Sequence, residues 1–152
     1  MTFLDQLLAN RILQSAVVGW MSAQILKTLL HWAIHKKFDI HRLFGDGGMP
    51  SAHSAAVTAL AVATGLQEGL HSASFAVAMM LAMVVVHDAC GVRQQAGKQA
   101  IVLNDILELL DKLGHTNDID RLNEFVGHTG LQVFFGCLLG MVVAVLMTGV
   151  LF

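Results

Sequence analysis

A serine and a histidine lie two residues apart at the start of an apolar segment, in the stretch GGMPSAHS. Pro50 suits the first turn of a helix, where its missing N–H costs nothing. A helix start presents free N–H groups and a partial positive charge, so it can hold a phosphate or an oxyanion. Ser51 would add a hydroxyl and His53 a proton donor. A Ser51 that only caps the helix and a His53 that only reaches the membrane surface fit the stretch equally well.

Two further stretches contain groups that could act on a phosphate. Arg93 follows an apolar segment and can donate paired hydrogen bonds to phosphate oxygens. Asp88 could orient a histidine or hold Arg93. The alternative is a basic turn that anchors the chain at a membrane surface. His128 precedes another apolar segment, where a histidine can be a nucleophile, a general base or simply an interfacial side chain.

Lys27, His31 and His35 recur at intervals of four residues and therefore share one face of an apolar helix. An ionisable residue inside a membrane span indicates a function, although Lys27 could instead extend to the membrane surface. No group of Asp, Glu, His or Cys with the spacing of metal ligands accompanies these residues. We therefore predict a histidine mechanism without a metal and without a cofactor.

The composition places these groups in a membrane protein. The 152 residues are 55% apolar and 13% charged, whereas a soluble domain has about 25% charged residues. Four segments approach the length of roughly 20 apolar residues that crosses a bilayer, namely residues 12–35, 54–70, 73–92 and 130–152. Residues 2–11 are expected to form an interfacial helix. Residues 93–129 are expected to contain an amphipathic helix on the membrane surface or against the bundle.

The predicted fold is all-α, a polytopic membrane bundle of about four spanning helices plus an amphipathic interfacial helix, in one domain of residues 1–152. Counting spans assigns seven basic residues to one face: Lys36, Lys37, Arg42, Arg93, Lys98, Lys112 and Arg121. The other face has at most Arg11, so the positive-inside rule makes the basic face cytoplasmic, in a bacterial inner membrane. The candidate groups at Ser51, Arg93 and His128 fall on this same face. The net charge of −2 predicts no binding to nucleic acid.

Three stretches and one lysine, taken together, resemble a known family. They are GGMPSAHSAAVTALA, HDACGVRQQAGKQAIVLN and GHTGLQVFFGCLLG, with Lys27 in the first span. The chain resembles the divergent branch of the type 2 phosphatidic acid phosphatase superfamily, which is related to acid phosphatases and vanadium haloperoxidases. The resemblance covers nearly the whole chain. It implies that His128 is the nucleophile and His53 the acid that protonates the leaving group, while Ser51 and the Ala52 N–H hold a phosphate oxygen.

The same resemblance implies that Lys27 and Arg93 bind phosphate as the lysine and arginine of the wider superfamily's motifs. The chain departs from those motifs at three points. Ala52 replaces a glycine, Gln132 stands where an aspartate orients the nucleophile, and the interval from the arginine to the nucleophile is much longer. Gln132 can still accept a hydrogen bond from an imidazole, and Asp88 could substitute for the aspartate.

The expected function is hydrolysis of a lipid phosphomonoester through a phosphohistidine intermediate. A cytoplasmic site favours phosphatidylglycerophosphate or phosphatidate over polyprenyl diphosphate recycled on the other side. The alternative is a non-catalytic membrane protein that binds or transports an anionic lipid or a small solute. A second GHT sequence at 114–116 precedes the acidic NDID, so His115 is not expected to act. Gly136 and Gly140 could serve a homodimer or packing inside the bundle.

Overall fold

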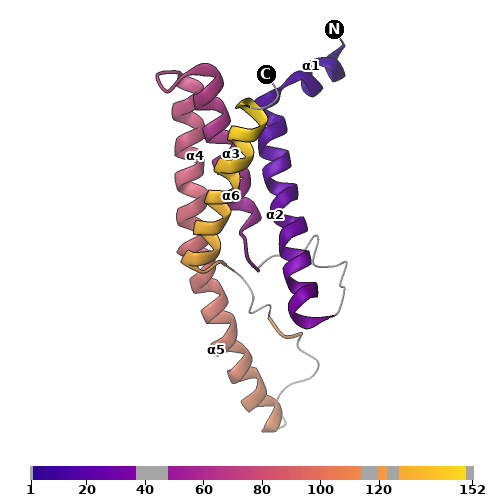
Figure 1. Ribbon diagram of the computed structural model, residues 1–152. Coiled ribbons are helices and arrows are strands. Elements are labelled where there is room, and N and C mark those ends of the chain that lie inside the picture. Colours follow the sequence, from indigo (N-terminus) through magenta and orange to yellow (C-terminus); the bar gives the residue numbers. More distant parts are fainter. Residues whose placement is uncertain (1, 37–47, 114–119, 123–126, 150–152) are drawn as a thin grey trace.

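The computed structural model describes residues 2–36, 48–113, 120–122 and 127–149 of the chain. Within these ranges the backbone forms helices and no strand, which confirms the all-α class. The helices are α1 (Phe3–Ala9), α2 (Arg11–His35), α3 (Ala52–Glu68), α4 (Ala73–Cys90), α5 (Val92–Lys112) and α6 (Gly130–Gly149) (Figure 1). Lys37, Arg42 and His115, which entered the sequence predictions, lie outside the described residues.

Four helices form a bundle with α3 at its centre. Helix α3 packs against α2, α4 and α6, and α2 also packs against α6 (Figure 1). Since α3 and α6 run opposite to α2 and α4, the start of α3, the end of α4 and the start of α6 meet at one end of the bundle (Figure 1). The residues expected to act on a phosphate lie at this end.

Helix α5 continues beyond the end of α4 and extends away from the bundle (Figure 1). Of the two placements expected for this segment, packing against the bundle is therefore wrong, and a place on the membrane surface stays a prediction. One side of α5 is nonetheless covered, because Gly97, Ala100 and Asn104 are buried. The segment 120–122 contributes to this cover through hydrogen bonds to Asn104.

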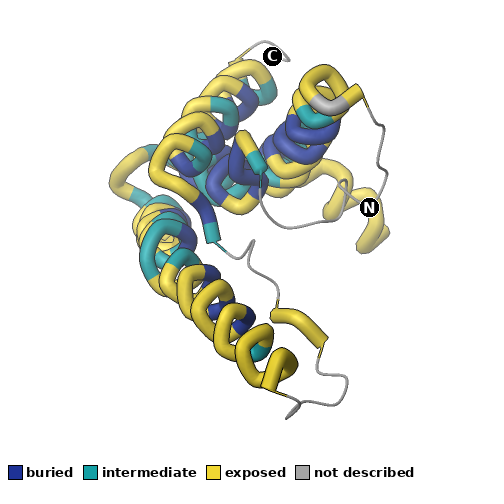
Figure 2. The backbone as a smooth tube through the Cα atoms, turned by 90° about the horizontal axis from the view of Figure 1, so that it is seen from below, coloured by how far each residue is buried: buried dark blue, intermediate teal, exposed yellow. Residues whose placement is uncertain are grey.

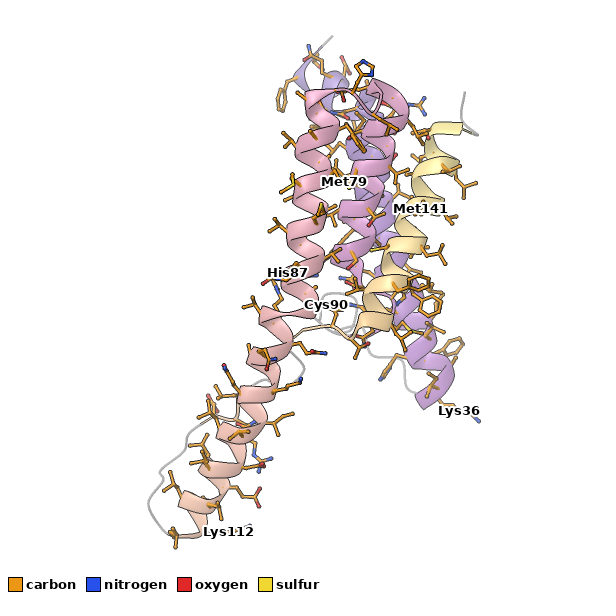
Figure 3. The ribbon with its side chains drawn as sticks, turned by 90° about the vertical axis from the view of Figure 1, so that its left-hand side faces the viewer. Lys36, Met79, His87, Cys90, Lys112 and Met141 are labelled. Carbon is orange, nitrogen blue, oxygen red and sulfur yellow. The ribbon has the colours of Figure 1, made fainter. Side chains whose placement is uncertain are left out.

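The bundle has small residues inside and large apolar residues outside. Its buried apolar positions are mostly alanines, such as Ala23, Ala55 and Ala59. Large apolar side chains, including Met79 and Met141, lie exposed on the outer faces (Figure 3). Figure 2 shows the buried positions of the bundle helices turned toward one another and the exposed positions turned outward. A water-soluble core would bury the large residues instead. Close contact through small residues is how helices associate in lipid, where apolar side chains gain nothing by leaving the surroundings.

The two glycines Gly136 and Gly140 pack inside the bundle, against the backbone of α3. A Cβ atom on Gly136 would lie 2.5 Å from the carbonyl oxygen of Ser51, and one on Gly140 would lie 2.3 Å from that of Ala55. Of the two roles expected for this pair, a homodimer face or packing inside the bundle, the structure shows the packing, because α3 covers both glycines. A homodimer through another face stays a prediction.

Two helical runs among the described residues are long and apolar enough to cross a membrane. They are Ala73–Lys112, which joins α4 and α5, and Gly130–Gly149, which is α6. Helix α3 has only 17 residues, and α2 contains the polar side chains of Lys27 and His31. The expectation of four spans is therefore met for the third and fourth predicted segments only.

Candidate active site

Ser51 caps the N-terminus of α3. Ser51 is fully buried, and its Oγ accepts hydrogen bonds from the backbone N–H of Ser54 at 3.3 Å and from the hydroxyl of Ser54 at 3.0 Å. Serine is favoured at this position because its oxygen satisfies an N–H group that the helix leaves unpaired. Of the two sequence interpretations of Ser51, the structure supports the helix cap.

Four of the predicted residues line one cavity of about 200 Å³ at this end of the bundle. The complete lining is His53, Val84, Val85, Asp88, Ala89, Arg93 and His128. It therefore combines the first turn of α3, the last turns of α4, the first turn of α5 and the segment before α6. Two imidazoles, a guanidinium and a carboxylate share a space about as large as a small anion needs.

The two histidines contact each other across the cavity. The ring centroids of His53 and His128 are 6.2 Å apart, and the rings meet edge to face at 78°. His53 is exposed, whereas His128 retains only 7% of its accessible surface. One phosphate group could therefore contact both imidazoles, with solvent reaching it from the His53 side.

Backbone contacts on both sides of the cavity hold His128 in place. Its N–H donates to the carbonyl oxygen of Ala89 at the end of α4, at 3.1 Å. The preceding Gly127 has a φ of +93°, and a Cβ there would lie 2.4 Å from the backbone nitrogen of Gln94. Only glycine combines this φ with such close approach. The chain before α6 therefore rests directly on the first turn of α5, beside Arg93.

Asp88 holds Arg93 at the edge of the cavity. The Nε of Arg93 donates to Oδ2 of Asp88 at 2.5 Å, and both side chains are partly exposed. The sequence is compatible with two partners for Asp88, a histidine or this arginine. The structure pairs it with the arginine, which orients the guanidinium toward a cavity that the two residues share.

Gln132 takes part in the N-terminal cap of α6. Its Oε1 accepts from the N–H of Thr129 at 3.0 Å, while Oγ1 of Thr129 accepts from the N–H of Gln132 at 3.4 Å. This reciprocal pair is a capping box. The backbone oxygen of Gln132 also accepts from the N–H of Ser51 at 3.0 Å, which joins the starts of α6 and α3. The sequence pattern Thr-x-x-Gln before an apolar run could have predicted this cap.

Lys27 lies in the bundle and not at its surface. Its side chain retains 6% of its accessible surface, and it passes within contact distance of Gly48, shortly before the start of α3. The alternative in which Lys27 extends to the membrane surface is therefore wrong. Lys27, Ser51 and the buried Ala52 gather around the start of α3 but do not line the cavity.

The family model described as the Divergent PAP2 family matches residues 8–143 of the chain, a range that includes every residue of the cavity. The chain belongs to the Divergent PAP2 family. This member of the Divergent PAP2 family is also 36% identical to the uncharacterized membrane protein YuiD of Bacillus subtilis (strain 168), over 93% of this chain and 96% of that protein. No solved structure matches the chain. The relationship to a membrane protein and the two apolar helical runs together show that this Divergent PAP2 protein is a membrane protein.

Proposed function

We propose that this protein is a lipid phosphate phosphatase that works through His128 and His53. The observation that supports the proposal is the contact of the two imidazoles, 6.2 Å apart, in a cavity that also includes Arg93. Membership in a PAP2-related family is consistent with it. A rigid histidine beside an arginine and a second histidine supplies a nucleophile, a phosphate ligand and a proton donor.

In the proposed reaction the His128 imidazole attacks phosphorus, and a nitrogen–phosphorus bond forms as the bond from phosphorus to the leaving oxygen breaks. The protonated His53 gives its proton to that oxygen, which departs as an alcohol. Water then attacks the phosphohistidine, and the neutral His53 accepts a proton from it. Phosphate leaves and His128 is restored. Arg93, oriented by Asp88, stabilises the charge on the phosphoryl oxygens throughout.

We expect positive charge around the start of α3 to contribute as well. The side chain of Lys27, which is buried in the bundle, and the N-terminal dipole of α3, capped by Ser51, both favour an anion nearby. In this proposal Ser51 and Ala52 act through the helix start, and direct contact with phosphate belongs to Arg93.

The substrate we propose is a phosphomonoester on a lipid of the cytoplasmic leaflet, phosphatidylglycerophosphate or phosphatidate. The basic residues near the cavity, among them Arg93 and Lys98, support a cytoplasmic orientation through the positive-inside rule. A monoester also suits a cavity of about 200 Å³, which takes one phosphate group and little more.

The decisive experiment is phosphate release from mixed micelles of lipid phosphates by the purified protein, with and without a chelator. We expect release that the chelator does not change and that His128→Ala removes. Lack of release from every lipid phosphate tested would rule out the phosphatase.

The capping role of Gln132 favours one alternative function. Position 132 holds an amide in place of the orienting carboxylate, and the oxygen of that amide binds the N–H of Thr129. In that case the cavity would bind an anionic lipid or a small solute without turnover. Saturable binding of phosphatidate without phosphate release would support this alternative.

A further inference from the structure

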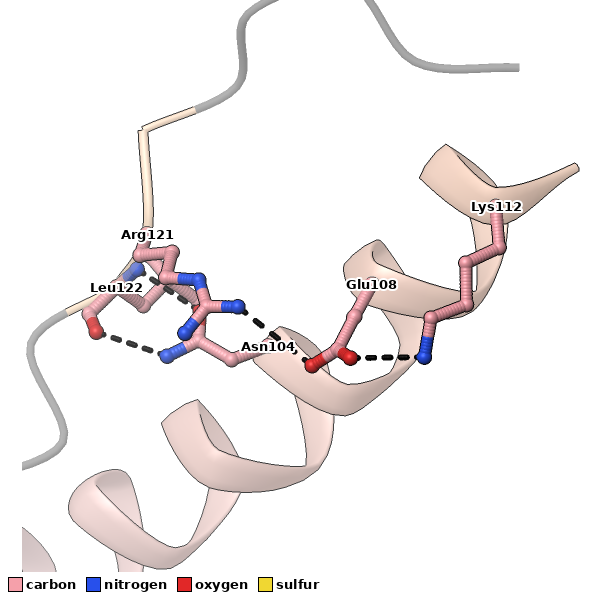
Figure 4. Close-up of polar contacts among 5 residues, drawn as sticks. All are labelled: Asn104, Glu108, Lys112, Arg121 and Leu122. Carbon is pink, nitrogen blue, oxygen red and sulfur yellow. Dashed lines mark hydrogen bonds and ion pairs between the residues drawn. The ribbon is translucent and has the colours of Figure 1, made fainter. Parts of the chain in front are cut away.

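The chain that leads back from α5 to the cavity is held on α5 by one asparagine. Nδ2 of Asn104 donates to the carbonyl oxygen of Leu122 at 3.0 Å, and Oδ1 of Asn104 accepts from the N–H of Leu122 at 2.9 Å (Figure 4). One side chain thus satisfies both backbone groups of a residue 18 positions away. Asn104 retains 5% of its accessible surface.

The neighbouring ion pairs of α5, unlike the hydrogen bonds of Asn104, are not buried. Glu108 pairs with Lys112 at 2.8 Å and with Arg121 at 3.5 Å, but all three side chains are well exposed (Figure 4). Exposed pairs contribute little because water and salt screen them. A buried amide that lost its partners would instead leave polar groups without hydrogen bonds, which is costly. Among the described residues, the two hydrogen bonds of Asn104 are therefore the strongest polar attachment of residues 120–122.

This attachment lies six residues before His128 along the chain. Of the described residues that follow, Gly127 packs on the backbone of Gln94, and the N–H of His128 bonds to Ala89. Fixing Leu122 shortens the stretch of chain that must close onto Gly127, and a shorter closure costs less conformational entropy. The clamp on α5 and the placement of His128 are thus coupled through the chain.

We propose that Asn104 is a positioning residue, which keeps His128 in the cavity through its pair of hydrogen bonds to Leu122. Its consequence for turnover rests on the proposed function. Its consequence for the order of His128 does not, because the hydrogen bond of His128 to Ala89 can be followed without any substrate.

The first test is amide hydrogen exchange of the purified full chain in detergent micelles, with peptides resolved by mass spectrometry. In Asn104→Ala we expect faster exchange in the peptides that contain Leu122 and His128, and unchanged exchange in α3, where the N–H of Ala55 binds Ser51. The control is Glu108→Gln, which removes the exposed ion pairs of the same helix. We expect it to exchange like the wild type.

Two exchange patterns would overturn the proposal. One is faster exchange at Leu122 with unchanged protection at His128, which would separate the clamp from the histidine. The other is uniform acceleration that includes α3, which would make Asn104 a residue of general stability. Asn104→Asp keeps an acceptor for the N–H of Leu122 but sets a carboxylate oxygen against the Leu122 carbonyl oxygen, so it should show an equally selective effect.

The second test is kinetic, on the lipid phosphate that the wild type hydrolyses. We expect Asn104→Ala to lower kcat by about tenfold or more, because a misplaced nucleophile loses reach, with KM unchanged, since Arg93 still binds phosphate. A rise in KM at constant kcat would contradict positioning. A wild type without turnover would refute the proposed function, while the exchange experiment would still decide the role of Asn104.

Discussion

Gly127 touches the backbone of Gln94 so closely that a Cβ atom on Gly127 would lie 2.4 Å from the Gln94 nitrogen. We predict that Gly127→Ala displaces His128 and lowers turnover by about a hundredfold, the effect of moving a reacting group by an ångström. The alanine must also adopt a φ of +93°. The measurement is kcat on the best lipid phosphate. Gly130→Ala is the matched control, because no described atom outside its own helix turn and chain neighbours lies within 4 Å of its Cβ position, and its activity should stay near that of the wild type.

The two histidines are expected to differ in their dependence on the leaving group. His128→Ala should abolish turnover of every substrate, because it removes the nucleophile. His53→Ala should slow poor leaving groups most, since an acidic leaving oxygen departs without a general acid. Rates for an alkyl and an aryl phosphate, compared across both variants, test this difference. His115→Ala is the control and should keep most activity. Wild-type turnover in His128→Ala would mean that another group attacks phosphorus.

Arg93 should not tolerate lysine. Its Nε binds Asp88 at 2.5 Å, and a guanidinium can bind that carboxylate and still contact phosphate through its other N–H groups. We predict that Arg93→Lys raises KM and lowers kcat/KM by about tenfold to a hundredfold. Asp88→Asn should have a smaller effect of the same kind, because the amide oxygen can still accept from Nε. If Arg93→Lys has the same KM and kcat/KM as the wild type, Arg93 does not bind phosphate through paired hydrogen bonds.

Packing of α6 on α3 should depend on Gly140. An alanine there places its Cβ 2.3 Å from the carbonyl oxygen of Ala55, so the helices must separate. We expect Gly140→Ala to reduce the free energy of unfolding in detergent by about 1–3 kcal/mol, the usual cost of overpacking. Gly149→Ala should be neutral, since no described atom outside its own helix turn and chain neighbours lies within 4 Å of the added Cβ. The mass of the detergent-solubilised protein should be the same in both variants. A lower mass in Gly140→Ala alone would mean that Gly140 also contributes to a contact between two chains.

The orientation of the chain can be measured with single cysteines in a protein whose Cys90 and Cys137 are replaced by alanine. Gln99 on α5 and Ser74 at the start of α4 are both exposed and lie toward opposite ends of the α4–α5 run. A membrane-impermeant thiol reagent added to intact cells should label Ser74→Cys and spare Gln99→Cys. The reverse pattern would put the cavity on the outer face.

Sequence alone determined the features that depend on neighbouring residues. Helix starts follow from local signals. The cap residue Ser51 and the apolar run that follows it predicted α3 to within a few residues, and the apolar run from Gly130 predicted α6 equally well. The capping box of Thr129 and Gln132 was also present in the sequence, although the family pattern drew attention to His128 as the partner of Gln132. Small residues at Gly136 and Gly140 indicated close helix contact, since only a missing side chain lets two backbones approach.

The tertiary structure decided which of these elements meet. His53 and His128 are 75 residues apart in sequence (128 − 53). Their contact exists because α3 and α6 begin at the same end of the bundle, where the N–H of His128 also bonds to Ala89 at the end of α4. Whether Asp88 holds Arg93 or a histidine, and whether Gly140 faces α3 or a second chain, depends on packing between distant segments. Helical periodicity gives the face of a residue but not the partner that covers it. The link from Asn104 to Leu122 is of the same kind, because a side-chain amide binds any backbone group that the fold brings within reach.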